Sequence, residues 1–317
     1  MKLSLFSTLR GYRKEYLPKD IFSGIIIAAV SIPISMGYAQ ISGIPAVYGL
    51  YGSVLPILLF ALFSTSRQFI FGVDAAPAAI VGGALSTLSI AAESEAAMDY
   101  VPAIALFAGL WLFIFFLLHA DKIVDFISTP VMGGFISGIA VTIILMQIPK
   151  LMGSPAGSGE LLELAEHIFA AAKNISWLSL FMGLGTLLLI RAFKKLAPKF
   201  PMAIVIMALG VLSTIVFHVD EKGVVLLQSV ERGLPSLMIP DFGNVDLTQA
   251  AGRGLMVAVV IMAETLLAEN TFAFRNDYKL NDRQEILACA AGNIAAAAVG
   301  CCPVNGSISR TSLNEQY

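Results

Sequence analysis

Charge is what this sequence has least of. Only 13% of its 317 residues are Asp, Glu, Lys or Arg, while 57% are hydrophobic, and the mean hydropathy is +0.81. A soluble globular domain carries about 25% charged residues. The composition therefore excludes an ordinary soluble domain and predicts a chain embedded in a lipid bilayer. The formal net charge of −2 argues against nucleic acid as a partner.

Cysteine and histidine are scarce as well. The three cysteines are too few and too clustered for a disulfide framework, and they fit no zinc spacing. The three histidines fall near the ends of apolar runs or in loops, without the spacing of a catalytic triad or a metal site. These residues are Cys289, Cys301, Cys302, His119, His167 and His218. We therefore expect no enzyme, no metal site and no cofactor.

Long apolar runs are abundant. About 20 apolar residues are needed to cross roughly 30 Å of hydrocarbon. The charge-free stretch from Ile21 to Ser66 is too long for one helix, and "SGIPAVYG" at its centre predicts a turn between two helices. We expect spans at about 21–38, 46–63, 75–91, 101–119, 128–148, 176–193, 201–218, 252–269 and 285–300, with a tenth beginning near 307.

Lysine and arginine predict the orientation of these spans. If the N-terminus is cytoplasmic, 14 of the 20 basic residues lie on the inner side and five on the outer side, with Arg310 set aside. Basic residues concentrate in cytoplasmic loops. We expect a multi-pass protein of the cell membrane (plasma or inner membrane), with residues 1–19 as a cytoplasmic segment and residues 219–251 as an extracytoplasmic loop.

Two apolar segments break the pattern of ordinary spans. In "STSRQFIFGVDAAPAAIVGG", β-prone residues precede Asp74 and Pro77, which together read as a helix start. In "CCPVNGSISRTSLN", a proline and small polar residues precede a helix that opens near Ser307. Irregular backbone at membrane depth survives only where protein buries it or where it lines a water-filled cavity. Two such segments are typical of an inverted repeat.

The spacing of the two broken segments agrees with a repeat. The first span starts near Asp20 and its broken helix opens at Asp74, 54 residues later. The eighth span starts near Arg253 and its broken helix opens at Ser307, again 54 residues later. Seven spans separate the two starts, and this odd number predicts that the second unit is inverted relative to the first.

Several stretches closely resemble the sulfate permease (SulP) family of anion transporters. They are "PAVYGLYGSVLPILLFALFSTSR", "IIAAVSIPISMGYAQISGIP", "STPVMGGFISGIAVTIILMQIPKLMG" and "GCCPVNGSISRTSLN". The resemblance implies an all-α polytopic membrane protein with two inverted repeats of seven helices, in which the third and tenth helices are discontinuous. Residues 20–218 would form the first repeat and residues 252–317 the start of the second. We then expect a chain that is truncated within its tenth helix, has no regulatory STAS domain and does not transport by itself.

The resemblance also implies a function. We expect a secondary active transporter of inorganic or small organic anions (sulfate, bicarbonate, chloride or dicarboxylate), working as a symporter or exchanger and held by the bilayer. A full-length protein could form a homodimer. The anion would lie between the N-termini of the third and tenth helices, near Ser35, Tyr38, Asp74, Ala75, Ser307, Ile308, Ser309 and Arg310. The alternatives are a nucleobase permease of the same fold and an anion channel or structural membrane subunit.

Arg310 and Glu264 each leave two interpretations open. Helix N-termini attract anions through free N–H groups and the helix dipole, and Arg310 would add a full positive charge there. Glu264 lies near the middle of the eighth span, where a carboxylate indicates function by default; by resemblance it would bind the coupling ion, Na⁺ or H⁺. Alternatively, Arg310 snorkels to the membrane interface or pairs structurally with an acid, Glu264 included. Glu269 is expected at the membrane interface, outside the site.

Asp74 is the least settled of the predicted site residues. It stands where the resemblance leads us to expect a small or apolar residue. Three roles remain open for it: a helix N-cap, a partner of Arg310 across the site, or a protonatable group that admits an anion only when neutral. Ile34 is a second departure, because many relatives carry a polar Gln after the proline of the first span.

Overall fold

Helices form almost all of the regular structure. The computed structural model describes residues 5–9, 11–124, 129–155, 157, 161–196, 202–226, 233–238 and 240–316. Two short 3₁₀ helices, Ser7–Leu9 and Lys14–Tyr16, lead into the first long helix. The helices are α1 (Leu17–Ile41), α2 (Ala46–Tyr51), α3 (Leu55–Phe63), α4 (Ala75–Thr87), α5 (Glu95–Leu118), α6 (Asp121–Val124), α7 (Thr129–Leu151), α8 (Leu161–Lys173), α9 (Trp177–Leu196), α10 (Met202–Phe217), α11 (Leu247–Arg275), α12 (Asp282–Ala298) and α13 (Ile308–Asn314).

Local sequence explains where several helices begin and end. The Ser94 side chain caps α5 by accepting from the Ala97 N–H, and the helix ends at His119 in the left-handed conformation. Asp246 caps α11 by accepting from the N–H groups of Thr248 and Gln249. Asn281 caps α12 in the same way through the Gln284 N–H. These caps satisfy backbone donors that have no partner inside the helix.

Most expected spans coincide with helices, with three differences. The span 46–63 is broken at residues 52–54 into α2 and α3, and α4 stops at Thr87 rather than continuing to residue 91. The amphipathic helix α8 was not expected. It has an apolar face and a charged face, and its 13 residues are too few to cross a bilayer. By length and composition, the helical segments Lys14–Ile41, Ala46–Phe63, Glu95–Leu118, Trp177–Leu196 and Leu247–Arg275 can each span a membrane.

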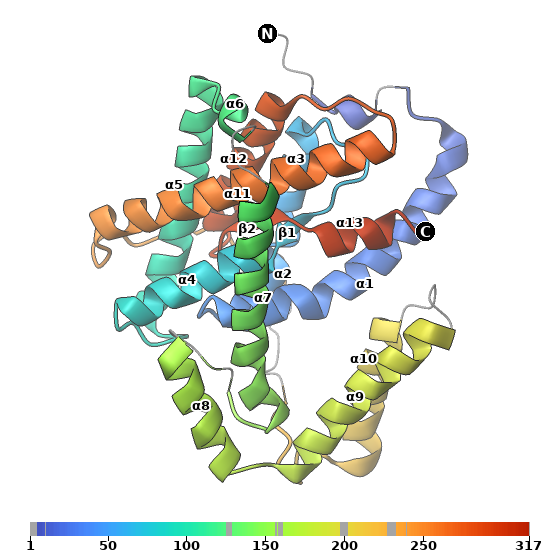
Figure 1. Cartoon of the computed structure of the whole chain (residues 1–317), viewed down its shortest axis with the longest axis vertical. Coiled ribbons are helices and arrows are strands. Elements are labelled where there is room, and N and C mark those ends of the chain that lie inside the picture. The colour runs from blue at the N-terminus through green and yellow to red at the C-terminus, as the bar shows by residue number, and fades with distance from the viewer. Residues whose placement is uncertain are drawn as a thin grey trace.

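A small antiparallel sheet lies in the middle of the helices. Strand β1 (Phe71–Val73) pairs with strand β2 (Val304–Gly306), and Phe71 stands opposite Gly306 while Val73 stands opposite Val304. Each strand runs directly into a helix, and α4 and α13 lead away from the sheet in opposite directions (Figure 1). The two broken segments therefore meet through their extended halves.

The helices form two groups of unequal packing. α5, α11 and α12 pack on one another, α12 also packs on α3, and the three helices supply most of the buried apolar residues. The window of α5 that could span a membrane is half buried, as is that of α11, whereas the corresponding window of α9 is not buried at all. At the lower end of the molecule, α8 lies at the left and α9 and α10 lie together at the right (Figure 1), and α7 packs on both α8 and α9. The sheet sits inside the first group.

Candidate functional site

The strand pair brings two helix starts together. Asp74 and Ser307 are the N-cap residues of α4 and α13. The Ser307 N–H donates to the carbonyl of Ile70 at 2.8 Å, and the Ser307 hydroxyl donates to Asp74 Oδ1 at 3.5 Å. Two helix N-termini, about 230 residues apart in the chain (307 minus 74), are thereby held against each other.

Side chains satisfy the outer edges of both strands. On β2, Asn293 receives the Val304 N–H and donates to the Val304 carbonyl, both at 3.0 Å. The Gly306 N–H donates to the Thr265 hydroxyl at 3.3 Å. Next to β1, the Ile70 N–H donates to the Thr311 hydroxyl at 3.0 Å. Because an unpaired backbone group is costly away from water, these side chains make irregular backbone tolerable at this depth.

Arg310 is the cation of this site and is almost fully buried, with 1% of its surface exposed. Its Nη2 donates to the Val73 carbonyl at 2.8 Å and lies 3.9 Å from Asp74 Oδ1. In the part of the chain that the structure describes, Nε and Nη1 have no hydrogen-bond partner. A guanidinium has five N–H donors, so part of the donor capacity of Arg310 is unused in this structure.

Asp74 adopts one of the three roles left open by the sequence. It occupies the N-cap position of α4 with an extended backbone, but its side chain makes no capping hydrogen bond. Its carboxylate instead faces Arg310, and 14% of the side chain is exposed. The interpretation as a partner of Arg310 across the site therefore agrees with the geometry, and the interpretation as a simple cap does not.

Glu264 belongs to the α13 side of the site. Its Oε2 receives a hydrogen bond from Asn305 Nδ2 at 2.7 Å, and Asn305 in turn accepts from the Thr265 hydroxyl at 2.6 Å. Within the described ranges, Glu264 forms no ion pair, so the alternative of a salt bridge with Arg310 is wrong. Glu264 also lines a cavity of about 180 Å³ together with Ile308 and Ser312.

The remaining predicted residues surround the helix starts unequally. Tyr38 is half-buried, and its hydroxyl interacts electrostatically with Asp74, Arg310 and Glu264. Ser35 is fully buried, and its hydroxyl accepts from Ser53 at 2.8 Å, so it supports α2 rather than facing the carboxylates. The other three predicted residues are partly or well exposed at the two helix starts: Ala75, Ile308 and Ser309.

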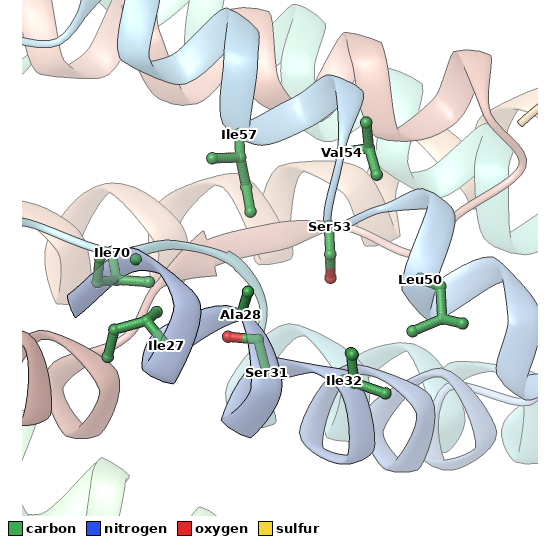
Figure 2. A pocket seen from close by; sticks show the side chains of 10 residues that line it. Ile27, Ala28, Ser31, Ile32, Leu50, Ser53, Val54, Ile57 and Ile70 are labelled. Atoms are coloured by element: carbon green, nitrogen blue, oxygen red, sulfur yellow. The ribbon is translucent and has the colours of Figure 1, made fainter. Parts of the chain in front are cut away.

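A larger cavity lies elsewhere. It has a volume of about 420 Å³ and is lined by residues of α1, α2, α3, the turn between α2 and α3, and the segment before β1. Figure 2 shows its wall, where Ser31 and Ser53 are the polar residues among the labelled side chains. The cavity includes no residue of the predicted site, and its apolar wall suits lipid or protein side chains better than an anion.

The sequence did not identify the supporting residues or the burial of one glutamate. Asn293, Thr265 and Asn305 hold β2 and Glu264 in place. The available signal was that Asn293 and Asn305 are polar residues within the charge-free run before Arg310 and that Thr265 follows Glu264. Glu269, which the sequence places at the membrane interface, is fully buried among the helices. α11 continues six residues past Glu269 to Arg275, which keeps this side chain inside the packed helices.

The chain matches a known protein family over most of its length. The model described as "Sulfate permease family" matches residues 17–317. A probable sulfate transporter of Mycobacterium tuberculosis is 26% identical over 304 residues, covering 96% of this chain and 54% of that protein. The chloroplastic sulfate transporter 4.1 of Arabidopsis thaliana is 29% identical over 323 residues, covering 98% of this chain and 46% of that protein.

A solved structure shares the fold. The transmembrane domain of the cyanobacterial bicarbonate transporter BicA matches with a TM-score of 0.82 and 20% identity, covering 96% of this chain and 78% of that chain. The predicted all-α fold with discontinuous third and tenth helices is confirmed by this match and by the β1–α4 and β2–α13 segments. The chain spans about half the length of the curated relatives it matches.

Proposed function

The chain belongs to the sulfate permease family, and on this premise we propose that it forms the anion-binding core of a secondary active transporter. Its relatives are transporters rather than enzymes. The substrate we propose is an inorganic or small organic oxyanion of the sulfate, bicarbonate or dicarboxylate class, with chloride as a simpler competitor. The protein would be multi-pass in the cell membrane.

The observation that carries the proposal is the unused donor capacity of Arg310. Its guanidinium is buried between the starts of α4 and α13, and Nε and Nη1 have no partner among the described residues. The planar fork of a guanidinium matches the oxygens of a carboxylate or sulfate and forms paired, charge-assisted hydrogen bonds with them. The α4 start adds the positive end of a 13-residue helix to the same place.

Glu264 supports a coupled mechanism. It is the predicted carboxylate at mid-depth of α11, it is partly exposed to a cavity, and Asn305 connects it to the strand that leads into α13. A cation or proton bound at Glu264 would neutralise its charge and change the hydrogen bonds of Asn305. We propose that binding of Na⁺ or H⁺ at Glu264 thereby influences the position of Arg310, four residues beyond β2.

An uptake panel tests the proposal. The full-length protein would be reconstituted in liposomes and supplied with labelled sulfate, bicarbonate, a dicarboxylate, chloride and uracil, at two pH values, with and without a sodium gradient. We expect saturable, concentrative uptake of one or more anions. Concentrative uptake of uracil alone would favour the nucleobase permease, and flux that only follows the electrochemical gradient would favour a channel.

The orientation is tested separately. We propose that the N-terminus is cytoplasmic, so the start of α5 faces outward and the loop between α11 and α12 faces inward. A cysteine introduced at Ser94 should react with an impermeant maleimide added to intact cells, whereas one at Asn276 should react only after permeabilisation. Labelling of Asn276→Cys from outside would reverse the proposed orientation.

A further inference from the structure

Two glutamates are buried together away from the helix starts. Glu269 on α11 and Glu285 on α12 are both 0% exposed. They lie where α11 and α12 pack on each other and where α12 packs on α3. Their carboxyl groups are close enough to interact with each other. Neither residue belongs to the site around Arg310, and no feature of the proposed transport mechanism uses them.

Glu285 has the surroundings of an ionised carboxylate. Its Oε2 receives a hydrogen bond from the Ser64 hydroxyl at 2.7 Å. Its Oε1 receives the Thr65 N–H at 2.6 Å and also the Thr65 hydroxyl. Glu285 further lies in the first turn of α12, at the positive end of the helix dipole. Three donors and the dipole stabilise a negative charge here.

Glu269 has none of these stabilising contacts. In the described part of the chain, neither of its carboxyl oxygens has a hydrogen-bond donor, and the ion pairs found join Arg275 to Glu315 and Arg310 to Asp74. An isolated charge buried away from water costs far more free energy than a neutral carboxyl group. A second negative charge beside Glu285 would add repulsion, and two adjacent buried carboxylates do not both ionise readily.

Among the described residues, no cation forms an ion pair with either glutamate. Asp282, on α12, adds negative charge near Glu269. Tyr278 interacts electrostatically with both glutamates, and its hydroxyl forms a hydrogen bond with the Ser66 hydroxyl at 3.2 Å. Cys289, buried on α12, is the remaining titratable neighbour. Arg67 stacks on the Tyr278 ring, with its guanidinium carbon 5.8 Å from the ring centre, rather than pairing with either glutamate.

We propose that Glu269 and Glu285 form a proton-binding site, in which Glu269 carries the proton and donates it to the ionised carboxylate of Glu285. The proton converts a repulsive contact into a hydrogen bond between α11 and α12, and Glu285 ties that bond to the end of α3 through Ser64 and Thr65. Neither glutamate lines the cavity of Glu264. The proposal does not rest on the anion site or on coupling at Glu264.

Loss of this proton has a predictable consequence. Two carboxylates would then face each other in the buried interface between α11 and α12. Because the folded protein binds a proton that an unfolded chain releases near neutral pH, its stability should fall as the pH rises. The effect belongs to the Glu269–Glu285 pair alone and should persist when Glu264 can no longer titrate.

Infrared spectroscopy tests the site directly. The full-length protein, labelled with ¹³C at glutamate carboxyl groups, would be measured at neutral pH in sodium-free buffer and again in D₂O. We expect a carbonyl band of a protonated glutamic acid that is retained in Glu264→Gln and in the exposed control Glu166→Gln, and that is lost in Glu269→Gln. If Glu269→Gln does not fold, Glu285→Gln serves instead, since removal of the acceptor should shift the band.

A second measurement follows thermal stability. The melting temperature of the parent should decline from neutral to alkaline pH, and Glu269→Gln, which mimics the protonated carboxyl group, should remove most of that decline. Glu166→Gln should keep it. A protonated band that is absent from the parent, or that disappears when sodium is added, would overturn the proposal; the latter result would identify the pair as a sodium site.

Discussion

The two strand–helix units of the molecule are built alike and charged in opposite ways. β1 leads through Asp74 into α4, and β2 leads through Ser307 into α13. Counted from the N-cap, Asp74 corresponds to Ser307, and Pro77 corresponds to Arg310 at the third helical position. One unit therefore places a carboxylate at its helix start, and the other places a guanidinium.

This difference shows how an anion could be controlled. Arg310 Nη2 and Asp74 Oδ1 are 3.9 Å apart, so the charges at the helix starts neutralise one another in this structure. An anion that binds Arg310 must compete with Asp74 or meet it in a neutral form. A site with two bare helix starts would bind anions more tightly and would release them more slowly.

The two units also differ in their support. β2 is held by Asn293 and Thr265, and Asn305 connects it to Glu264. The segment before β1 is held by Thr311, which belongs to α13 itself. The α13 unit is therefore the one whose position a change at Glu264 can influence.

The largest effect is expected from Glu264→Gln. The substitution removes the titratable carboxyl group that is bonded to the α13 unit through Asn305, and it keeps the size of the side chain and the hydrogen bond from Asn305. Concentrative uptake by the full-length protein should fall to background, because the driving ion loses its site. Anion binding should survive and lose its dependence on the coupling ion. Gradient-driven uptake in liposomes, compared with exchange of anion at equilibrium, separates the two; an unchanged gradient response would leave Glu264 a structural residue.

The next largest effect is expected from Arg310→Gln, which removes the positive charge at the start of α13. Unit charges 4 Å apart attract by about 4 kcal/mol at an effective dielectric of 20. Desolvation reduces the net effect, so we expect anion affinity to fall about five- to thirtyfold. Arg310→Lys should lose less. Calorimetric titration of the purified protein with the transported anion measures both.

A control separates affinity from folding in that experiment. If Arg310 only neutralises Asp74, Arg310→Gln should lower the melting temperature, and the double variant with Asp74→Asn should restore it. If Arg310 binds the anion, the melting temperature should stay near that of the parent and the double variant should remain a weak binder. A stable Arg310→Gln protein with undiminished affinity would contradict the site assignment.

The general plan of the fold was predictable because membrane spans obey simple rules of length and polarity. The unusual helix starts at Asp74 and Ser307 were also readable, since an N-cap and a proline stand where an ordinary span would be apolar. The break at residues 52–54 was not predicted, because Gly52, Ser53 and Val54 carry no charge. Pro56, in the first turn of α3, is a local signal of a helix start. The other cause is tertiary, since Gly52 fits closely against Cys301 and Val73 across the fold.

The residues of the site divide in the same way. Arg310, Asp74 and Glu264 were identified because charge inside an apolar segment is costly. Which of them pair was left open, because the pairing depends on the register of β1 against β2, which three-residue strands do not specify. The burial of Glu269 likewise depends on which face of α11 packs against α12, a fact about tertiary structure.

Asp74→Asn tests the role of the negative charge at the start of α4. The substitution keeps the size of the side chain and removes the charge that competes with the substrate for Arg310. We expect anion affinity to rise about fivefold, equivalent to roughly 1 kcal/mol, and its dependence on pH to weaken. Titrations at two pH values measure both quantities. A lower affinity in this variant would mean that Asp74 orients Arg310 rather than competing with the anion.

The smallest effect is expected from Gly72→Ala, which changes the distance between the two halves without changing their charge. A Cβ at residue 72 would lie 3.2 Å from Arg310 Nη1 and 3.7 Å from Nη2, and the φ of +157° at Gly72 strains any other residue. The guanidinium would have to move by a few tenths of an ångström, which strains its bond to Val73 and moves its free donors. Because small overpacking is tolerated at modest cost, we expect affinity to fall about twofold. Gly233→Ala, at a similar φ of +152° but with no atom within 4 Å of an added Cβ, is the matched control and should leave affinity unchanged. Equal effects of the two alanines would show that the guanidinium position does not set the affinity.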